Sequence, residues 1–334
     1  MLTDQQRKVI VTAANLAPSV HNTQPARWRF DPDGAVTILA DRLRFLAVGD
    51  PQGQDAALSC GAAIEGTVMA LASQGLRGEV TEDLWMQPSN ADGPCPVARI
   101  EIRGDTRPDP LAEHVPHRFT WRGTFLPPGD EILRALQQWA ATRDDITVVH
   151  DVQAREMLAD LNDEASLRAY RNPAYRKELV SWMRLSPRHS DYHRDGLGLK
   201  ALDISRIEGM GAQVTLGTPL YGLLDRLGIS GPLLSEKAKT MSAAAIALVH
   251  MPVDQSPVVT GRQFYRAWLD LTRLGLAAWP MAVLADDSQA SQQCRKRFAI
   301  PAERRFVMAL RLGAAGGTVP RARLPAETLI VDSM

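Results

Sequence analysis

The sequence predicts an α+β fold built from two related halves. The chain has 334 residues, 45% of them hydrophobic, which is enough for one large core or two ordinary ones. Helix-type and strand-type patterns alternate along it. Two apolar helices end alike, in A-L-A-S-Q-G-L at Leu76 and in D-L-T-R-L-G-L at Leu276. We therefore expect a duplicated unit, with residues 1–112 and 113–334 as its halves and an extra segment, a possible lid, at about 170–240.

The first half is predicted to begin with a helix over residues 4–17. Thr3 and Gln6 have the spacing of a capping box, and Pro18 ends the helix. The elements expected after it are a strand at 36–40, a helix at 55–76 and strands at 79–85 and 97–103, with a loop at 88–96 and a linker at 104–117. The second helix contains Gly61 and Gly66, which let another backbone approach closely, so we expect this helix to be central.

The second half alternates in the same way. The expected helices cover 129–141, 152–169 and 261–276. The expected strands cover 146–150, 242–250 and 306–312, and the strand at 306–312 is expected to be the last one in the chain.

Composition limits the class of protein. Thirty-eight basic residues balance thirty-eight acidic ones, so no overall field attracts nucleic acid or an anionic membrane. Cys60, Cys95 and Cys294 form neither a disulfide framework nor a zinc pattern. No leader and no run of about 18 apolar residues is seen, which indicates a soluble cytoplasmic protein.

Two basic motifs are candidate anion sites. In R-F-T-W-R, Arg118, Thr120 and Arg122 alternate and offer two guanidiniums and a hydroxyl to one phosphate. In P-R-A-R-L-P, Arg321 and Arg323 have the same spacing between two prolines. Taken singly, each pair is also typical of a solvated surface.

Other chemistries find less support. His114 with His117, and His189 with His193, have spacings compatible with a metal site, but the second pair lies in a polar stretch typical of an exposed loop. The sequence contains no G-x-S-x-G, no P-loop and no G-x-G-x-x-G after a predicted strand.

Together, three ordered motifs resemble those of flavin-dependent nitroreductases. P-S-V-H-N-T-Q-P at 18–25 resembles their P-S-x-x-N-x-Q-P-W loop, R-F-T-W-R their R-x-S-x-R phosphate motif, and P-R-A-R-L-P their C-terminal basic motif. Length, the two halves and the segments K-E-L-V-S-W-M-R and D-G-L-G are most similar to the Acg-type branch, in which two nitroreductase-like halves are fused in one chain. The motifs divide between the halves, so the resemblance implies one FMN site per chain.

The resemblance also implies roles for particular residues. Arg118, Thr120, Arg122, Arg321 and Arg323 would hold the FMN phosphate. Ser19, Asn22 and Gln24 would bond the ribityl chain or the ring edge, and the loop at Pro280 and Met281 would approach flavin N5, with the Met281 N–H as the candidate donor. Ala26 stands where the family has Trp, with Trp28 two positions later on the same face of a strand.

The expected function is an FMN-dependent oxidoreductase. A hydride would pass from NAD(P)H through the flavin to a nitro-aromatic, a quinone or a similar small acceptor, in a monomer or homodimer. The alternative is a protein that sequesters FMN under a lid, with Tyr175, Trp182 and Met183 closing on the ring. A flavin-destroying enzyme of the BluB kind and a histidine-ligated metalloenzyme are further alternatives.

Overall fold

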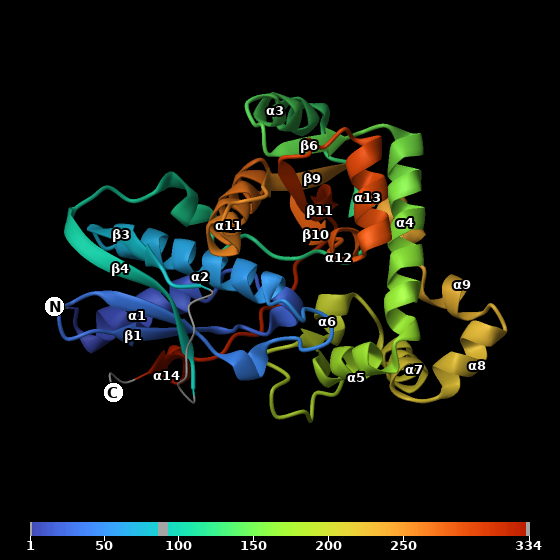
Figure 1. Ribbon diagram of the computed structural model, residues 1–334, viewed down its shortest axis with the longest axis horizontal. Helices are drawn as coiled ribbons and strands as arrows, with labels where there is room; N and C mark the ends of the chain where they lie inside the picture. Colours follow the sequence, from blue (N-terminus) through green and yellow to red (C-terminus); the bar gives the residue numbers. More distant parts are fainter. Residues whose placement is uncertain (1, 86–92, 332–334) are drawn as a thin grey trace.

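The computed structural model describes residues 2–85 and 93–331 (Figure 1). Most of the predicted loop at 88–96 lies outside these residues. The described residues form two large, mainly antiparallel sheets and one small parallel sheet of two strands, β7 and β8. Each large sheet has a long helix beside it, and the two helices pack on each other between the large sheets.

The first sheet is built mainly by the N-terminal part of the chain. Its order is β12-β1-β2-β4-β3, and all neighbours are antiparallel except β12, which pairs parallel with β1. The elements are α1 (Asp4–Ala14), β1 (Ala26–Phe30), β2 (Val36–Ala40), α2 (Gln54–Ala72), β3 (Leu76–Asp83), β4 (Cys95–Asp105), α14 (Ala326–Leu329) and β12 (Ile330–Val331). The predicted capping box is present: Thr3 Oγ1 accepts from the Gln6 N–H at 3.3 Å.

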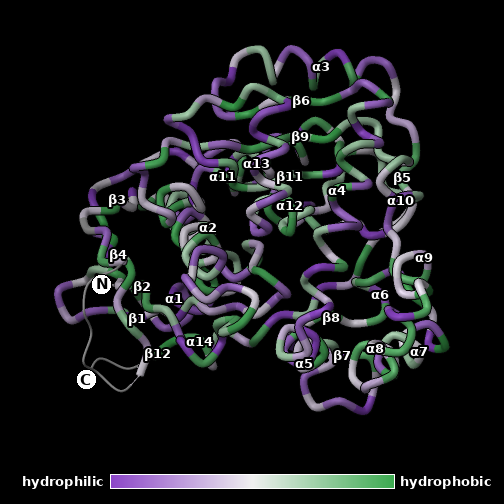
Figure 2. Tube along the Cα trace, turned by 45° about the vertical axis from the view of Figure 1, so that its right-hand side comes forward, coloured by the Kyte–Doolittle hydropathy of each residue, from purple (hydrophilic) through white to green (hydrophobic). Residues whose placement is uncertain are grey.

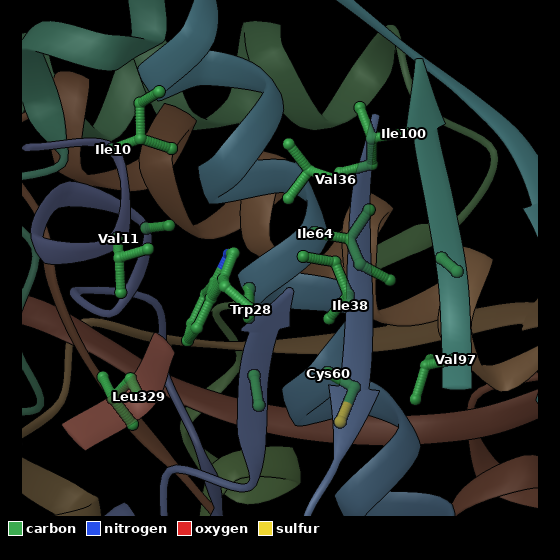
Figure 3. Close-up of a cluster of buried hydrophobic side chains, with 14 of the residues drawn as sticks. Ile10, Val11, Trp28, Val36, Ile38, Cys60, Ile64, Val97, Ile100 and Leu329 are labelled. Carbon is green, nitrogen blue, oxygen red and sulfur yellow. The ribbon is translucent and has the colours of Figure 1, made fainter. Parts of the chain in front are cut away.

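Helix α2 is the buried centre of this half. Trp28 and Ile38 from the sheet pack with Ile64 of α2, as Figure 3 shows. Trp28 is fully buried and donates its indole N–H to Thr67 Oγ1 at 2.8 Å, so it belongs to this core. By length and composition α2 alone, among the described helices, is apolar enough to cross a membrane, and 89% of the tested window is buried inside the protein.

The second sheet is built by the C-terminal part. Its order is β10-β11-β9-β6, all antiparallel, and β5 pairs with the end of β11. The elements are β5 (Phe125–Leu126), α3 (Asp130–Ala141), β6 (Ile146–Val149), β9 (Ala245–Pro252), α11 (Pro257–Arg273), β10 (Ala277–Pro280), α12 (Val283–Asp286), α13 (Ser288–Arg297) and β11 (Arg304–Ala315). The sequence predicts that the strand at 306–312 is the last one. In the structure, β12 follows β11 and joins the first sheet.

The two halves repeat one topology. The spatial order β1-β2-β4-β3 matches β6-β9-β11-β10, and the long helix lies between the second and third strands in chain order in both halves. Each long helix is followed by a left-handed glycine, Gly75 with φ 77° and Gly275 with φ 80°, and then by a strand. The similar helix endings in the sequence therefore reflect equivalent positions in the fold.

The halves differ most between their first two strands. Residues 31–35 join β1 to β2, whereas residues 150–244 join β6 to β9. The longer connection, which we call the insertion, holds α4 (Val152–Arg171), α5 (Pro173–Ser181), β7 (Met183–Arg184), β8 (Leu197–Gly198), α6 (Leu199–Leu202), α7 (Arg206–Gly217), α8 (Leu220–Arg226), α9 (Ser230–Leu234) and α10 (Lys237–Ser242). Short 3-10 helices lie at Val20–Asn22, Arg42–Arg44 and Pro110–His114.

Candidate functional site

A cavity of about 1260 Å³ lies where the two halves and the insertion meet. Its wall combines residues 18–22, the start of α2, residues 118–122, the segment from β10 to α12, residues 319–323 and parts of the insertion. Its volume exceeds the roughly 300–1,000 Å³ typical of small-molecule sites, so a ligand with a fused ring system and a side chain has room.

The R-F-T-W-R segment lies beside β10. Thr120 forms a bridge with Ala278, and the Trp121 N–H donates to the Ala278 oxygen at 3.1 Å. Arg118 is 3% exposed, donates from Nη2 to the Leu16 oxygen at 2.9 Å and lies 4.7 Å from the centre of the Trp268 ring. Its Nε has no partner in the described parts of the chain and is buried.

The C-terminal arginines join the same wall. Arg321 donates to the Arg118 oxygen at 2.7 Å. Arg323 donates from Nε to the Asn15 oxygen at 2.6 Å and from Nη1 to Asn22 Oδ1 at 2.6 Å. Arg122, on the insertion side, donates to the Ala201 oxygen at 2.9 Å. The two basic motifs, about two hundred residues apart in sequence, thus line one cavity.

These four arginines lack an acidic partner. Within residues 2–85 and 93–331, none of them has a carboxylate at ion-pair distance, although Glu236 acts on Arg122 from farther away. Burial first, and then the charges of Arg118 and Arg321, lower the pKa of Arg323 to about 9. Burial lowers the pKa values of Arg118 and Arg122 to about 10. Clustered cations that are largely removed from water are stabilised by an anion, so the geometry points to an anionic ligand.

The loop after α1 is held in an unusual backbone conformation. His21, Asn22 and Gln24 have φ values of 45°, 57° and 52°, a left-handed region that non-glycine residues rarely adopt. Asn22 is fixed there by its bond to Arg323 and by its own donation to the Ala322 oxygen at 3.1 Å. Ser19 and Asn22 line the cavity.

Gln24 does not line the cavity. Its side chain is 3% exposed; its Oε1 accepts from the Leu324 N–H at 2.8 Å and from Asn15 Nδ2 at 2.9 Å, and its Nε2 donates to the Arg194 oxygen at 2.8 Å. The predicted contact with a ligand is therefore wrong for this residue. Gln24 instead connects the loop to the C-terminal segment and to the insertion.

The structure also corrects the prediction for the loop after β10. Pro280 and Met281 line the cavity, but the Met281 N–H donates to the Ala309 oxygen at 2.8 Å and so is not free for a ligand. The next residue, Ala282, also lines the cavity, and its N–H has no partner among the residues described. Among the described residues, the unpaired N–H of this loop is thus one residue later than predicted.

Sequence reasoning missed several titratable side chains of the cavity, among them Asp55, Asp286 and His21. Asp55, at the start of α2, and Asp286, at the end of α12, both line it. Burial and the charge of Asp50 raise the pKa of Asp55 to about 7, and burial and Asp55 raise the pKa of Asp286 well above its usual range. Burial, aided by Arg122, lowers the pKa of His21 to about 4. No local pattern marks the two acids, because they come together only when α2 and α12 pack across the cavity.

The insertion is attached to the first half by carboxylates. Glu178 of α5 accepts from the Val48 N–H at 3.0 Å and the Gly49 N–H at 2.7 Å, and Asp195 pairs with Arg44 at 3.0 Å. Tyr175 and Met183 line the cavity. Trp182 does not: its ring lies 6.0 Å and 5.4 Å from the guanidinium carbons of Arg44 and Arg184, which corrects the expectation that Trp182 closes on a ligand.

No group of three or more potential metal ligands is found in the part of the chain that the structure describes. His189 lies in an exposed loop, while His193 lines the cavity.

The repeated topology of the two halves agrees with the duplicated α+β fold that the sequence predicts. Over 182 residues, 52% of this chain, the sequence is 30% identical to the "Putative NAD(P)H nitroreductase Rv3131" of Mycobacterium tuberculosis, of which the match covers 50%. Over 189 residues, 54% of this chain, it is 31% identical to the "Putative NAD(P)H nitroreductase acg" of the same species, of which 55% is covered. The chain spans about half the length of the curated relatives it matches.

Solved structures of nitroreductases are similar at lower identity. The FMN-dependent nitroreductase NfnB from Mycobacterium smegmatis in complex with NADPH is 19% identical, with 64% of this chain and 94% of that chain covered and a TM-score of 0.35. A nitroreductase with bound FMN from Desulfitobacterium hafniense is 14% identical, with 68% and 99% covered and a TM-score of 0.34. No protein-family model matches the sequence. The curated relatives confirm the resemblance to Acg-type nitroreductases that the three motifs indicate.

Proposed function

We propose that this protein is an FMN-dependent oxidoreductase that takes a hydride from NAD(P)H and passes it to a nitro-aromatic, a quinone or a similar small acceptor. One observation carries the proposal: a buried arginine, Arg118, and three partly buried ones, Arg122, Arg321 and Arg323, line the cavity between the two halves without a carboxylate partner among the described residues. A phosphate monoester with two negative charges matches this charge, and charge-assisted bonds from guanidinium groups are strong.

The chain's residues fit such a ligand. Arg118, whose Nε is buried without a partner, would bind the phosphate together with Arg321 and the Thr120 hydroxyl. Arg323 would add its charge while keeping Asn22 in place through their 2.6 Å bond. The flavin, when bound, supplies the redox chemistry. The protein would bind and orient the flavin, and the insertion would cover it.

Two features of the cavity wall favour an uncharged aromatic molecule as the electron acceptor. The Ala282 N–H is a neutral donor beside the space for the ring, and His21 is neutral at pH 7 because its pKa is about 4. Tyr175 and Met183 add flat and polarisable surface. We place the protein in the cytoplasm, which its three free, buried cysteines support.

The test is flavin binding followed by reduction. Wild-type protein is expected to purify with a flavin spectrum or to take up added FMN, and the double variant Arg118→Ala, Arg122→Ala is expected to lose it, since each charged bond contributes about 1.5–3 kcal/mol. Arg226→Ala is the matched control, because Arg226 is exposed on α8 and does not line the cavity. Full FMN occupancy in the double variant would refute the phosphate site.

A second function is favoured by the way the insertion is held. The bonds of Glu178 and Asp195 to the first half keep the insertion over the cavity, as a flavin-sequestering protein requires. Anaerobic addition of NADH or NADPH separates the two functions. Bleaching of the flavin band supports the reductase, and an unchanged band in flavin-loaded protein supports storage.

A further inference from the structure

The insertion carries an apolar surface on its outer side. In α7, the side chains of Ile207, Met210 and Val214 are 83%, 68% and 52% exposed. They are spaced i, i+3 and i+7 and so form one stripe along the helix. None of the three lines the cavity.

Helix α8 repeats the arrangement. Leu220, Leu223 and the following Leu227 have the same spacing and are also exposed, and Ile229 continues the surface toward α9. Helix α7 contacts α8, and α8 contacts α9. These helices form the lower right corner of the molecule in Figure 1, and Figure 2 shows hydrophobic stretches there. We call the seven side chains of α7, α8 and the turn after α8 the corner patch.

The opposite sides of the same helices are apolar too. Leu216 and Tyr221 are buried in a cluster with Leu179 of α5. A helix that is apolar on both sides is normally buried on both sides. The corner patch therefore resembles one side of a protein–protein interface.

We propose that the corner patch is the surface through which two copies of this chain associate. Its seven side chains expose on the order of 800 Å², which is about what each partner contributes to a standard interface. The largest apolar patch on a typical monomer is only about 300–600 Å².

The charges around the patch fit a second copy better than a membrane. No charged residue occurs from Gly209 to Leu224, so the patch offers no cluster of cations to anionic lipid. At its ends Arg206 lies near Glu208 in sequence, and Arg226 follows Asp225. Both signs are thus present at each end, so two copies related by a two-fold axis can place opposite charges against each other.

The proposal is tested by the mass of the full-length protein in solution, measured by sedimentation across a range of concentrations. Wild-type protein is expected to dimerise. Met210→Glu combined with Leu223→Glu is expected to weaken the dimer about 100-fold or more, because it puts charges into the centre of an apolar contact. Both residues are exposed, so the circular dichroism spectrum should not change.

Leu43→Glu is the matched control, since Leu43 is 93% exposed and far from the insertion in sequence. It should leave the dimer intact. A wild-type monomer at all concentrations, or a dimer that persists in the double variant, overturns the proposal. Flotation of wild-type protein with phosphatidylcholine or phosphatidylserine vesicles, lost in the double variant, would overturn it in favour of a membrane surface.

Discussion

Gly61 and Gly261 face each other at the crossing of α2 and α11. A Cβ placed on Gly61 would lie 3.0 Å from the Gly261 Cα and 2.1 Å from the Val258 oxygen, and one on Gly261 would lie 2.2 Å from the Leu58 oxygen. The two backbones therefore touch without side chains between them. Because the cavity lies between the halves that these helices hold together, the crossing also sets the distance between the cavity walls.

Gly61→Ala is expected to lower the free energy of unfolding by about 1–3 kcal/mol or more, because α2 and α11 must move apart to admit the methyl group. Urea unfolding measures this loss, and FMN affinity should fall with it. Gly222→Ala in α8 is the control: nothing lies within 4 Å of its added Cβ, and a helical Gly to Ala change normally stabilises by about 0.5–1 kcal/mol. Equal stability of the two variants would mean that the helices do not meet here.

Much of the fold follows from local patterns. Strand β2 has the predicted bounds, the capping box of α1 is present, and Gly61 and Gly66 meet α11 and α1 as their small size predicts. Strand β1 was not among the predicted elements, although its sequence A-R-W-R-F alternates apolar and basic residues as a strand does.

The site was harder to predict than the fold. The arginines were found because basic residues two positions apart form short motifs. Gln24 belongs to a short motif and Met281 to a predicted loop, so both were expected to contact a ligand. The Gln24 Oε1 already accepts from the Leu324 N–H, and the Met281 N–H already donates to the Ala309 oxygen, which only the tertiary structure shows. Asp55 and Asp286 have no motif at all and are recognised only from their common cavity.

Asn22→Ala is expected to destabilise the protein by about 1–3 kcal/mol and to weaken FMN binding. The variant removes the acceptor of the 2.6 Å bond from Arg323 and leaves a residue with a Cβ at φ 57°. Asn22→Gly loses the same bonds but tolerates this φ, so it should be more stable than Asn22→Ala by about 1 kcal/mol. Thermal unfolding and FMN titration of both variants check this, and an Ala variant as stable as the Gly variant would contradict it.

Asp55→Asn is expected to stabilise the protein at pH 8 and to have much less effect at pH 5. The folded protein holds the Asp55 proton up to a pKa of about 7, whereas the unfolded chain releases it near pH 4. The stability due to this proton is present at low pH and is lost as the pH rises through 7. Asn cannot ionise, so the gain at pH 8 should be about 1 kcal/mol or more.

Urea unfolding at both pH values measures the difference. Asp254→Asn is the control, since Asp254 is exposed and does not line the cavity, and it should leave the pH dependence unchanged. An equal rise in the free energy of unfolding at pH 5 and pH 8 would show that ionisation of Asp55 does not destabilise the folded protein.

Inorganic phosphate is expected to raise the melting temperature of flavin-free protein more than chloride does at the same ionic strength. The anion would bind the folded protein beside Arg118 and Arg321, where it offsets the repulsion between their charges. At phosphate concentrations about 100 times its dissociation constant, such binding stabilises by about 2.7 kcal/mol. The double variant Arg118→Ala, Arg122→Ala should lose the difference between the two salts, and Arg226→Ala should keep it. A difference that survives in the double variant would place phosphate elsewhere on the protein.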